Sequence, residues 1–223
     1  MTRRKWVDIL ISVTTYKYVI NKMKINSLQI RELLLEKNLR LFGAKELGGL
    51  LGLSRRRRLY YLEKGLNEGL LVKLKRGLYC LKTDRPSELE IANRLYRPSY
   101  ISFEYALAFY NLLPEMVYTV TSATGKTTRN FSVEGKNYQF TAIKPAAFTG
   151  YELKTVGATR CLMAEPEKAL ADYLYLVSLG RRAAPDRLNL AGLGQAKVGQ
   201  YSRLFQRSSL NGLVAKIFKE TDA

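Results

Sequence analysis

The chain reads Ser54-Arg-Arg-Arg-Arg-Leu-Tyr-Tyr-Leu-Glu-Lys-Gly-Leu66 and then Leu71-Val-Lys-Leu-Lys-Arg-Gly-Leu-Tyr79, and these two stretches decide the fold. Ser54 can cap a helix, because its hydroxyl can accept a hydrogen bond from a backbone N–H of the first turn. Gly69 can end that helix after Glu68. The second stretch places Gly77 where a tight hairpin turn needs a positive φ. The sequence therefore predicts a basic helix followed by a basic β-hairpin.

Two shorter helices are expected before the basic helix. Residues 27–37 can be capped by Asn26 or Ser27, and residues 44–51 form a short helix that ends at Gly52. The apolar side of the first helix consists of Leu28, Ile30, Leu33 and Leu34, with Leu35 as a further candidate. Three helices followed by a hairpin are typical of a winged helix-turn-helix. We therefore predict such a domain over residues 25–82.

The leucines of the basic helix predict its orientation. Leu59 and Leu62 begin a stripe at helical spacing that is expected to face the core. At about 100° per residue, Arg57, Tyr61 and Lys64 then point away from the core. Arginine can donate two hydrogen bonds to a guanine, and hairpin cations can contact phosphates without sequence preference. The residues expected to contact DNA are Ser54, Arg55, Arg56, Arg57, Arg58, Tyr60, Tyr61, Lys64, Lys73, Lys75 and Arg76.

The charge balance agrees with a polyanionic partner. The chain has 37 basic and 19 acidic residues, a net charge of +18. Residues 1–97 hold 22 basic and 9 acidic residues, so most of the excess charge lies in this part of the chain. Such an excess favours nucleic acid as a partner. A basic surface that only keeps the protein soluble remains an alternative.

The residue types argue against an enzyme. The absence of histidine removes the commonest general base and the histidine-containing zinc sites. Gly125-Lys126-Thr127 is similar to the end of a phosphate-binding loop, but Val120 occupies the position of the required first glycine. Cys80 and Cys161 are expected to be buried thiols in a reducing compartment. We therefore expect a cytoplasmic protein without catalytic activity, cofactor or metal.

The first 24 residues form an expected N-terminal extension. Trp6–Ile20 is apolar and faintly similar to a signal peptide, but Asp8 interrupts it, Lys17 lies inside it, and it is too short to span a bilayer. We therefore predict no membrane segment. Met23 precedes a more natural domain start, so translation from Met1 or from Met23 is left open.

The second half predicts a mixed domain. A linker with a bridging helix is expected over residues 83–97, with the helix itself at 88–96, and a C-terminal domain over 98–223. Helical spacing and capping residues predict helices from Ser102 to Leu112 or Leu113, over 166–179, and at 197–205 and 210–219. Residues rich in Tyr, Phe, Val and Thr predict strands at 116–122, 128–133 and 138–143. The expected fold class is α+β, a winged helix-turn-helix followed by a mixed α/β domain.

Several stretches of the second half carry a resemblance to a known family. They are Pro98-Ser-Tyr-Ile-Ser-Phe-Glu-Tyr-Ala-Leu-Ala-Phe-Tyr110 with Leu113-Pro-Glu115, the residues Thr121, Lys126, Thr128, Arg129 and Phe131, the pair Ile143-Lys-Pro145 and Gly150-Tyr-Glu152, and Glu165-Pro-Glu-Lys-Ala-Leu-Ala-Asp-Tyr-Leu-Tyr-Leu176. In this order they resemble the AbiEi-like abortive-infection antitoxins, the transcriptional regulators of type IV toxin–antitoxin systems. The resemblance covers about residues 28–218.

The resemblance implies a repressor that is also an antitoxin. Its N-terminal domain would bind inverted repeats in operator DNA and repress its own operon. Its C-terminal domain would support cooperative repression and counter a nucleotidyltransferase-type toxin. Whether the chain contacts that toxin directly is left open. The oligomeric state is also left open, and one alternative is a monomer that binds DNA cooperatively. Glu167, Lys168 and Asp172 match the antitoxin motif, with either a functional or a structural role. The alternative is a basic interaction module that binds an acidic protein or another nucleic acid without repression.

Overall fold

The computed structural model describes residues 25–185 and 187–221. It has a mixed α+β fold, as the sequence predicts. The chain divides between Pro86 and Ser87 into two compact units, here called unit 1 and unit 2. The division falls in the stretch for which the sequence predicts a linker. The predicted extension over residues 1–24, with both candidate start methionines, lies outside the described residues.

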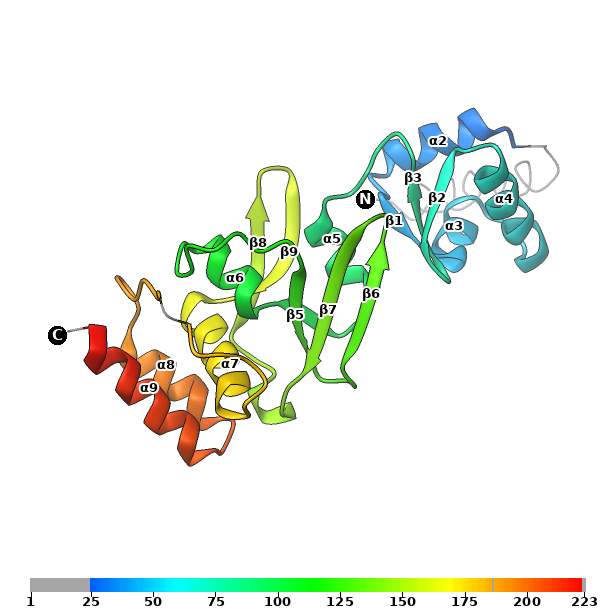
Figure 1. Cartoon of the computed structure of the whole chain (residues 1–223). Helices are drawn as coiled ribbons and strands as arrows, with labels where there is room; N and C mark the ends of the chain where they lie inside the picture. The colour runs from blue at the N-terminus through cyan, green and yellow to red at the C-terminus, as the bar shows by residue number, and fades with distance from the viewer. Residues whose placement is uncertain (1–24, 186, 222–223) are drawn as a thin grey trace, which may run out of the picture. The chain divides into compact units, whose positions relative to one another are not determined.

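The described part of unit 1 contains three α-helices, each of which begins after a residue in an extended conformation (Figure 1). The side chain of Asn26 accepts a hydrogen bond from the N–H of Gln29 at 2.8 Å, and Ser54 caps the basic helix. Gly52 and Gly69 have positive φ and turn the chain after the second and third of these helices. The three helices are α2 (Ser27–Glu36), α3 (Ala44–Leu50) and α4 (Arg55–Asn67).

A small antiparallel sheet completes unit 1. Its strands are β1 (Leu41–Phe42), β2 (Leu71–Lys75) and β3 (Leu78–Leu81), in the order β1-β3-β2. Strands β2 and β3 form the predicted hairpin, and Gly77 adopts a φ of 81° in its turn. Strand β1 pairs with β3 and so joins the hairpin to the helices.

The core of unit 1 lies between the helices and the sheet. Leu34, Phe42, Leu47 and Leu51 are at most 1% exposed, and burying each such side chain stabilises the fold by about 1.5–3 kcal/mol. The prediction that Leu28 belongs to the apolar side of α2 is wrong, since its side chain is 57% exposed. Leu28 comes two residues before the buried Ile30, which corresponds to about 200° of helical rotation. The two side chains therefore lie on opposite sides of α2.

Unit 2 is built on a six-stranded mixed sheet with the order β6-β7-β5-β4-β9-β8 (Figure 1). Strand β4 runs parallel to β9 and β5 parallel to β7, and the other neighbours are antiparallel. All five residues of β5 are buried, so helices or loops cover both faces of the sheet at its centre. The strands are β4 (Ser99–Ile101), β5 (Val120–Thr124), β6 (Arg129–Val133), β7 (Lys136–Ala142), β8 (Tyr151–Val156) and β9 (Thr159–Ala164).

Five α-helices accompany this sheet in the described part of unit 2. Helices α5 and α6 contact strand β5, and α7 contacts β9, while α8 and α9 lie side by side against α7 (Figure 1). Tyr175 of α7 stacks on Phe205, with ring centroids 4.2 Å apart, and so fixes the turn between α8 and α9. The helices are α5 (Glu88–Leu95), α6 (Phe103–Phe109), α7 (Pro166–Ser178), α8 (Gln195–Arg203) and α9 (Ser208–Thr221).

Two of the predicted elements of unit 2 have different bounds. The helix expected to run to Leu112 or Leu113 ends at Phe109, because Asn111 adopts a φ of 57° and the N–H of Leu112 closes back on the carbonyl of Leu107. The strand expected at 116–122 lies at 120–124, and Met116 is 76% exposed. Strands β4, β8 and β9 were not predicted.

Candidate nucleic-acid interface

The four arginines occupy the first turn of α4. Ser54 adopts an extended conformation, and its Oγ accepts a hydrogen bond from the N–H of Arg57 at 3.5 Å. Arg55 and Arg56 are exposed, and the turn contains no acidic residue. The positive end of the helix dipole adds to these charges, so an anion bound here would relieve their mutual repulsion.

Arg57 and Arg58 are half-buried, and the two side chains differ in their surroundings. The guanidinium carbon of Arg57 lies 5.9 Å from the ring centroid of Tyr61, a cation–π distance. The stem of Arg58 packs on α3, where a Cβ on Gly48 would be 2.8 Å from its Cδ. The buried Nε of Arg58 has no hydrogen-bond partner among the described residues. Arg58 therefore extends along the core side of α4.

The predicted orientation of Tyr61 is wrong. Its side chain is only 4% exposed, and its hydroxyl accepts a hydrogen bond from the N–H of Ile25 at 3.0 Å. Leu59, which the sequence places in the core, is 50% exposed. The buried side of α4 is formed by Tyr61, Leu62 and Gly65 together with the stem of Arg58. Tyr61 therefore contributes to the core and is not available for contact with a ligand.

This change of orientation defines a different exposed face on α4, here called the α4 face. It consists of Arg55, Arg56, Leu59 and Tyr60, which lie at positions i, i+1, i+4 and i+5 of the helix. Tyr60 is 59% exposed. The face thus offers two guanidinium groups, an apolar side chain and a phenol, which can respectively bind guanine, a thymine methyl group and a phosphate. In the sequence, Gly65 could have indicated this face. A residue without a side chain lets β2 pack closely on one side of the helix, and the exposed face lies on the other side.

Lys64 lies near the other end of α4 and is partly neutralised. Its Nζ is 3.6 Å from one carboxylate oxygen of Glu68, and the other oxygen of Glu68 accepts a hydrogen bond from the hydroxyl of Ser27. Lys64 is half-buried. The predicted contact residues of α4 are therefore not equivalent, because the exposed arginines Arg55 and Arg56 lie at its N-terminal turn.

The hairpin supplies further cations. Lys73 and Arg76 are exposed, and Lys75 is half-buried. Leu74 and Leu78 face the core, so the lysines on either side of Leu74 point away from it. The pairing shifts by one residue between Lys73 and Lys75, which bends the strand next to the turn.

The three residues of the antitoxin motif lie on α7. Lys168 and Asp172 are fully buried and form an ion pair. The other carboxylate oxygen of Asp172 accepts hydrogen bonds from Tyr100 at 3.0 Å and from Ser102 at 2.7 Å. Burial raises the pKa of Asp172 and lowers the pKa of Lys168, and the attraction between the two charges opposes both changes. This network connects α7 to β4.

Glu167 takes part in an ion-pair network between the start of α7 and Lys197 of α8. Its carboxylate is 3.1 Å from the Nζ of Lys197, which also contacts Glu165 at 2.8 Å. Tyr201 donates a hydrogen bond to Glu165 at 2.9 Å. The hydrogen bond from Lys197 lowers the pKa of Glu165. These contacts attach α8 to the start of α7, so Glu167 has a structural partner in this arrangement.

The two cysteine thiols are buried in the core. Burial raises the pKa of Cys80 and raises the pKa of Cys161 to about 11, so both thiols are protonated at neutral pH. Within residues 25–185 and 187–221, no three His, Cys, Asp or Glu side chains are grouped as metal ligands.

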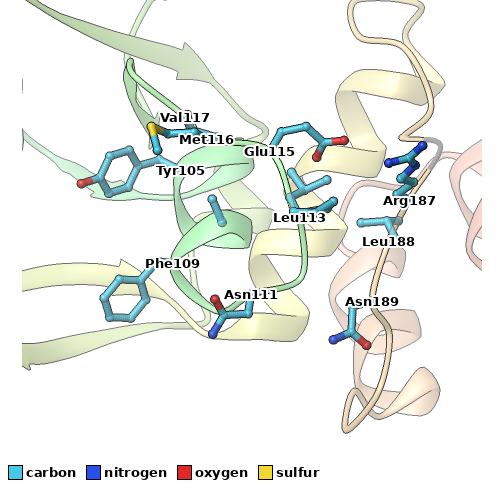
Figure 2. A pocket seen from close by; sticks show the side chains of 12 residues that line it. Tyr105, Phe109, Asn111, Leu113, Glu115, Met116, Val117, Arg187, Leu188 and Asn189 are labelled. Carbon is cyan, nitrogen blue, oxygen red and sulfur yellow. The ribbon is translucent and has the colours of Figure 1, made fainter.

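A hollow of about 790 Å³ lies beside α6 in unit 2 (Figure 2). Figure 2 shows Tyr105 and Met116 on one side of it and Leu188 on the other, with Glu115 and Arg187 as its charged residues. Its described lining combines apolar side chains, such as Leu113 and Val117, with the amides of Asn111 and Asn189.

Comparison with known proteins adds no assignment, because neither a family model nor a curated protein matches this chain. None of the helices in the described parts of the chain has the length and apolar character needed to cross a membrane.

Proposed function

We propose that unit 1 is a winged helix-turn-helix that binds duplex DNA. Helix α4 would enter the major groove with the α4 face, and the β2–β3 hairpin would contact phosphates as the wing. The observation that carries the proposal is the α4 face itself: two exposed arginines, without an acidic neighbour in their turn, next to an exposed leucine and tyrosine. An exposed apolar side chain beside exposed arginines can contact a thymine methyl group while the arginines bind guanine.

The regulatory role is proposed from the resemblance of unit 2 to the AbiEi-like antitoxins. By that resemblance the chain would repress the operon that encodes it and a nucleotidyltransferase-type toxin, and would counter that toxin. The operator would contain inverted repeats. The buried Lys168–Asp172 pair suggests that part of the antitoxin motif maintains the fold of unit 2.

A footprint on the DNA upstream of the gene tests the proposal. The purified full chain should protect a discrete site, and expression of the neighbouring gene should be toxic only when this chain is absent. With about six phosphates neutralised, the logarithm of affinity should fall with the logarithm of salt at a slope of about −5. A slope near zero would overturn the DNA-binding proposal. Binding to acidic proteins or to RNA, with none to upstream DNA, would favour the interaction-module alternative.

Paired variants separate base contact from general charge. Arg55→Ala/Arg56→Ala should weaken binding and relax the preference for the operator by about 1–3 kcal/mol per lost base contact. The control is Arg203→Ala/Lys219→Ala, which removes two exposed cations from α8 and α9. Equal effects of the two variants on sequence preference would show that α4 does not read bases.

A further inference from the structure

Strand β8 forms one edge of the six-stranded sheet, and β9 is its one neighbour among the strands of the described residues (Figure 1). The turn Gly157-Ala158 joins the two strands, whose register runs through six consecutive residue pairs. Just before β8, the carbonyl of Gly150 accepts a hydrogen bond from the N–H of Glu165 at 3.0 Å. Because backbone groups alternate in direction along a strand, the even-numbered residues of β8 bond to β9. The backbone groups of its odd-numbered residues therefore face the open side.

The features that usually prevent pairing at a sheet edge are weak on β8. Natural edge strands are protected by charged side chains, by proline or by a bulge. The register of β8 with β9 contains no bulge, and the strand contains no proline. Its one lysine, Lys154, is paired with Glu152 at 2.8 Å. Leu153, between these two residues, is 51% exposed. The edge therefore has no net charge and carries an exposed leucine at its centre.

The sequence of β8 is complementary to itself in the antiparallel direction. A two-fold axis at Leu153 would place this residue opposite Leu153 of a second copy, and Glu152 opposite Lys154 on each side of the axis. Opposite charges directly across a strand pair are favourable, and like charges are unfavourable. An axis at Lys154 would place two lysines opposite each other, and an axis at Glu152 two glutamates. An axis between two residues would bring an outward-facing backbone group against an inward-facing one.

We propose that unit 2 associates with a second copy of this chain through antiparallel pairing of β8, centred on Leu153. This inference goes beyond the proposed function and does not depend on DNA. The pairing adds a strand to each sheet edge and joins the two sheets into one. Leu153 forms the hydrogen-bonded pair on the axis, and Glu152 and Lys154 form an ion pair on each side of it. A single pair of strands buries less than the roughly 1,200 Å² of a stable interface, so association is expected at micromolar concentrations.

Sedimentation equilibrium of the full chain without DNA tests the proposal. Each copy carries a net charge of +18, so the measurement is made at about 0.3 M salt, which screens the repulsion between copies. The chain should be monomeric at about 1 μM, and the share of dimer should rise up to about 500 μM. A chain that stays monomeric over this whole range would overturn the proposal. This outcome would leave the proposed DNA binding of unit 1 untouched, because no DNA is present.

Charge variants test the register. Glu152→Lys places two lysines opposite each other on both sides of the axis, and Lys154→Glu places two glutamates there. Each variant alone should weaken self-association about tenfold or more. An equimolar mixture of the two should recover association, because every cross-strand pair then joins opposite charges. The controls Glu63→Lys and Lys219→Glu make the same charge changes at exposed positions of α4 and α9 and should have little effect. A mixture that associates no better than its components would contradict the register.

A cysteine cross-link provides an independent measurement. The Cα atoms of a hydrogen-bonded antiparallel pair are about 5.5 Å apart, a separation that suits a disulfide. Leu153→Cys should therefore form a covalent dimer with oxidised glutathione. Thr155→Cys is the control on the same strand, because its two copies would lie about 13 Å apart. Cys80 and Cys161 are buried, and circular dichroism should show that all variants are folded. Equal cross-linking of the two cysteine variants would show that the contact is not centred on Leu153.

Discussion

Gly65 shows how one missing side chain sets the packing of the basic helix. A Cβ built on Gly65 would lie 2.9 Å from both Cγ and Cδ1 of Leu71, in the strand that starts the hairpin. Gly65→Ala should therefore lower the free energy of unfolding by about 1–3 kcal/mol through overpacking. Gly49→Ala is the matched control, because nothing lies within 4 Å of its added Cβ in helix α3. That change should stabilise the chain by up to about 1 kcal/mol. Urea unfolding followed by circular dichroism measures both, and effects of the same sign would contradict the packing argument.

The buried pair in α7 leads to a second prediction for single residues. Lys168→Met leaves the carboxylate of Asp172 buried without its cation and should cost about 3–5 kcal/mol of stability. The double variant Lys168→Met/Asp172→Leu removes both charges and should recover a large part of that loss, although Tyr100 and Ser102 then lose their acceptor. Chemical denaturation of the three proteins provides the comparison. A double variant as unstable as the single one would show that the charge of Asp172 is not the cause.

Helix α4 shows that the sequence predicts the bounds of a helix better than the side that it buries. Its caps at Ser54 and Gly69 are local, and the predicted bounds agree with the structure. Its buried side depends on a tyrosine whose hydrogen-bond donor, the N–H of Ile25, lies 36 residues away. A leucine pattern alone favours Leu59 over Tyr61, because it counts apolar residues and contains no information about a distant donor. The helix itself was therefore predicted correctly, but its exposed side is partly different from the one that the sequence predicts.

At the scale of elements, α8 is attached to α7 through a carboxylate, which makes that attachment sensitive to acid. The hydrogen bond from Lys197 lowers the pKa of Glu165 below its ordinary value of about 4.3. A lowered pKa in the folded state contributes stability above the unfolded pKa, and this stability is lost as the pH falls through the folded pKa. Glu165→Gln should thus lower the melting temperature at pH 7 and make it depend less steeply on pH below about 4.

The control for this prediction is Glu63→Gln, which changes an exposed carboxylate of α4 in unit 1. Melting curves between pH 7 and pH 2.5 compare the two variants with the unaltered chain. If Glu165→Gln keeps the acid dependence of the unaltered protein, the ion pair with Lys197 does not stabilise the attachment of α8.

The sheet of unit 2 shows where prediction of elements from sequence stops. Strands β6 and β7 were predicted because Gly135 separates two runs of strand-forming residues. Strand β4 has three residues and is defined by pairing with β5 and β9, far along the chain. Strand β8 lies at the edge of the sheet, with exposed Glu152, Leu153 and Thr155 and only β9 as a neighbour. Short or edge strands of this kind depend on tertiary pairing, which a local sequence pattern does not contain.

At the scale of the whole molecule, the net charge of +18 predicts two opposite effects of salt. Salt screens the repulsion between like charges, so the free chain should melt at a higher temperature as ionic strength rises from about 0.02 M to 0.3 M. If unit 1 binds duplex DNA as proposed, the DNA should stabilise the folded state by mass action, by about 2.7 kcal/mol at a hundred times its dissociation constant. Because binding weakens steeply with salt, the increase in melting temperature caused by DNA should shrink over the same range.

Thermal melts with and without the upstream duplex should therefore converge as salt increases, while the melting temperature of the free chain rises. A DNA-dependent shift that does not change with salt would mean that the cations of this chain do not bind its phosphates.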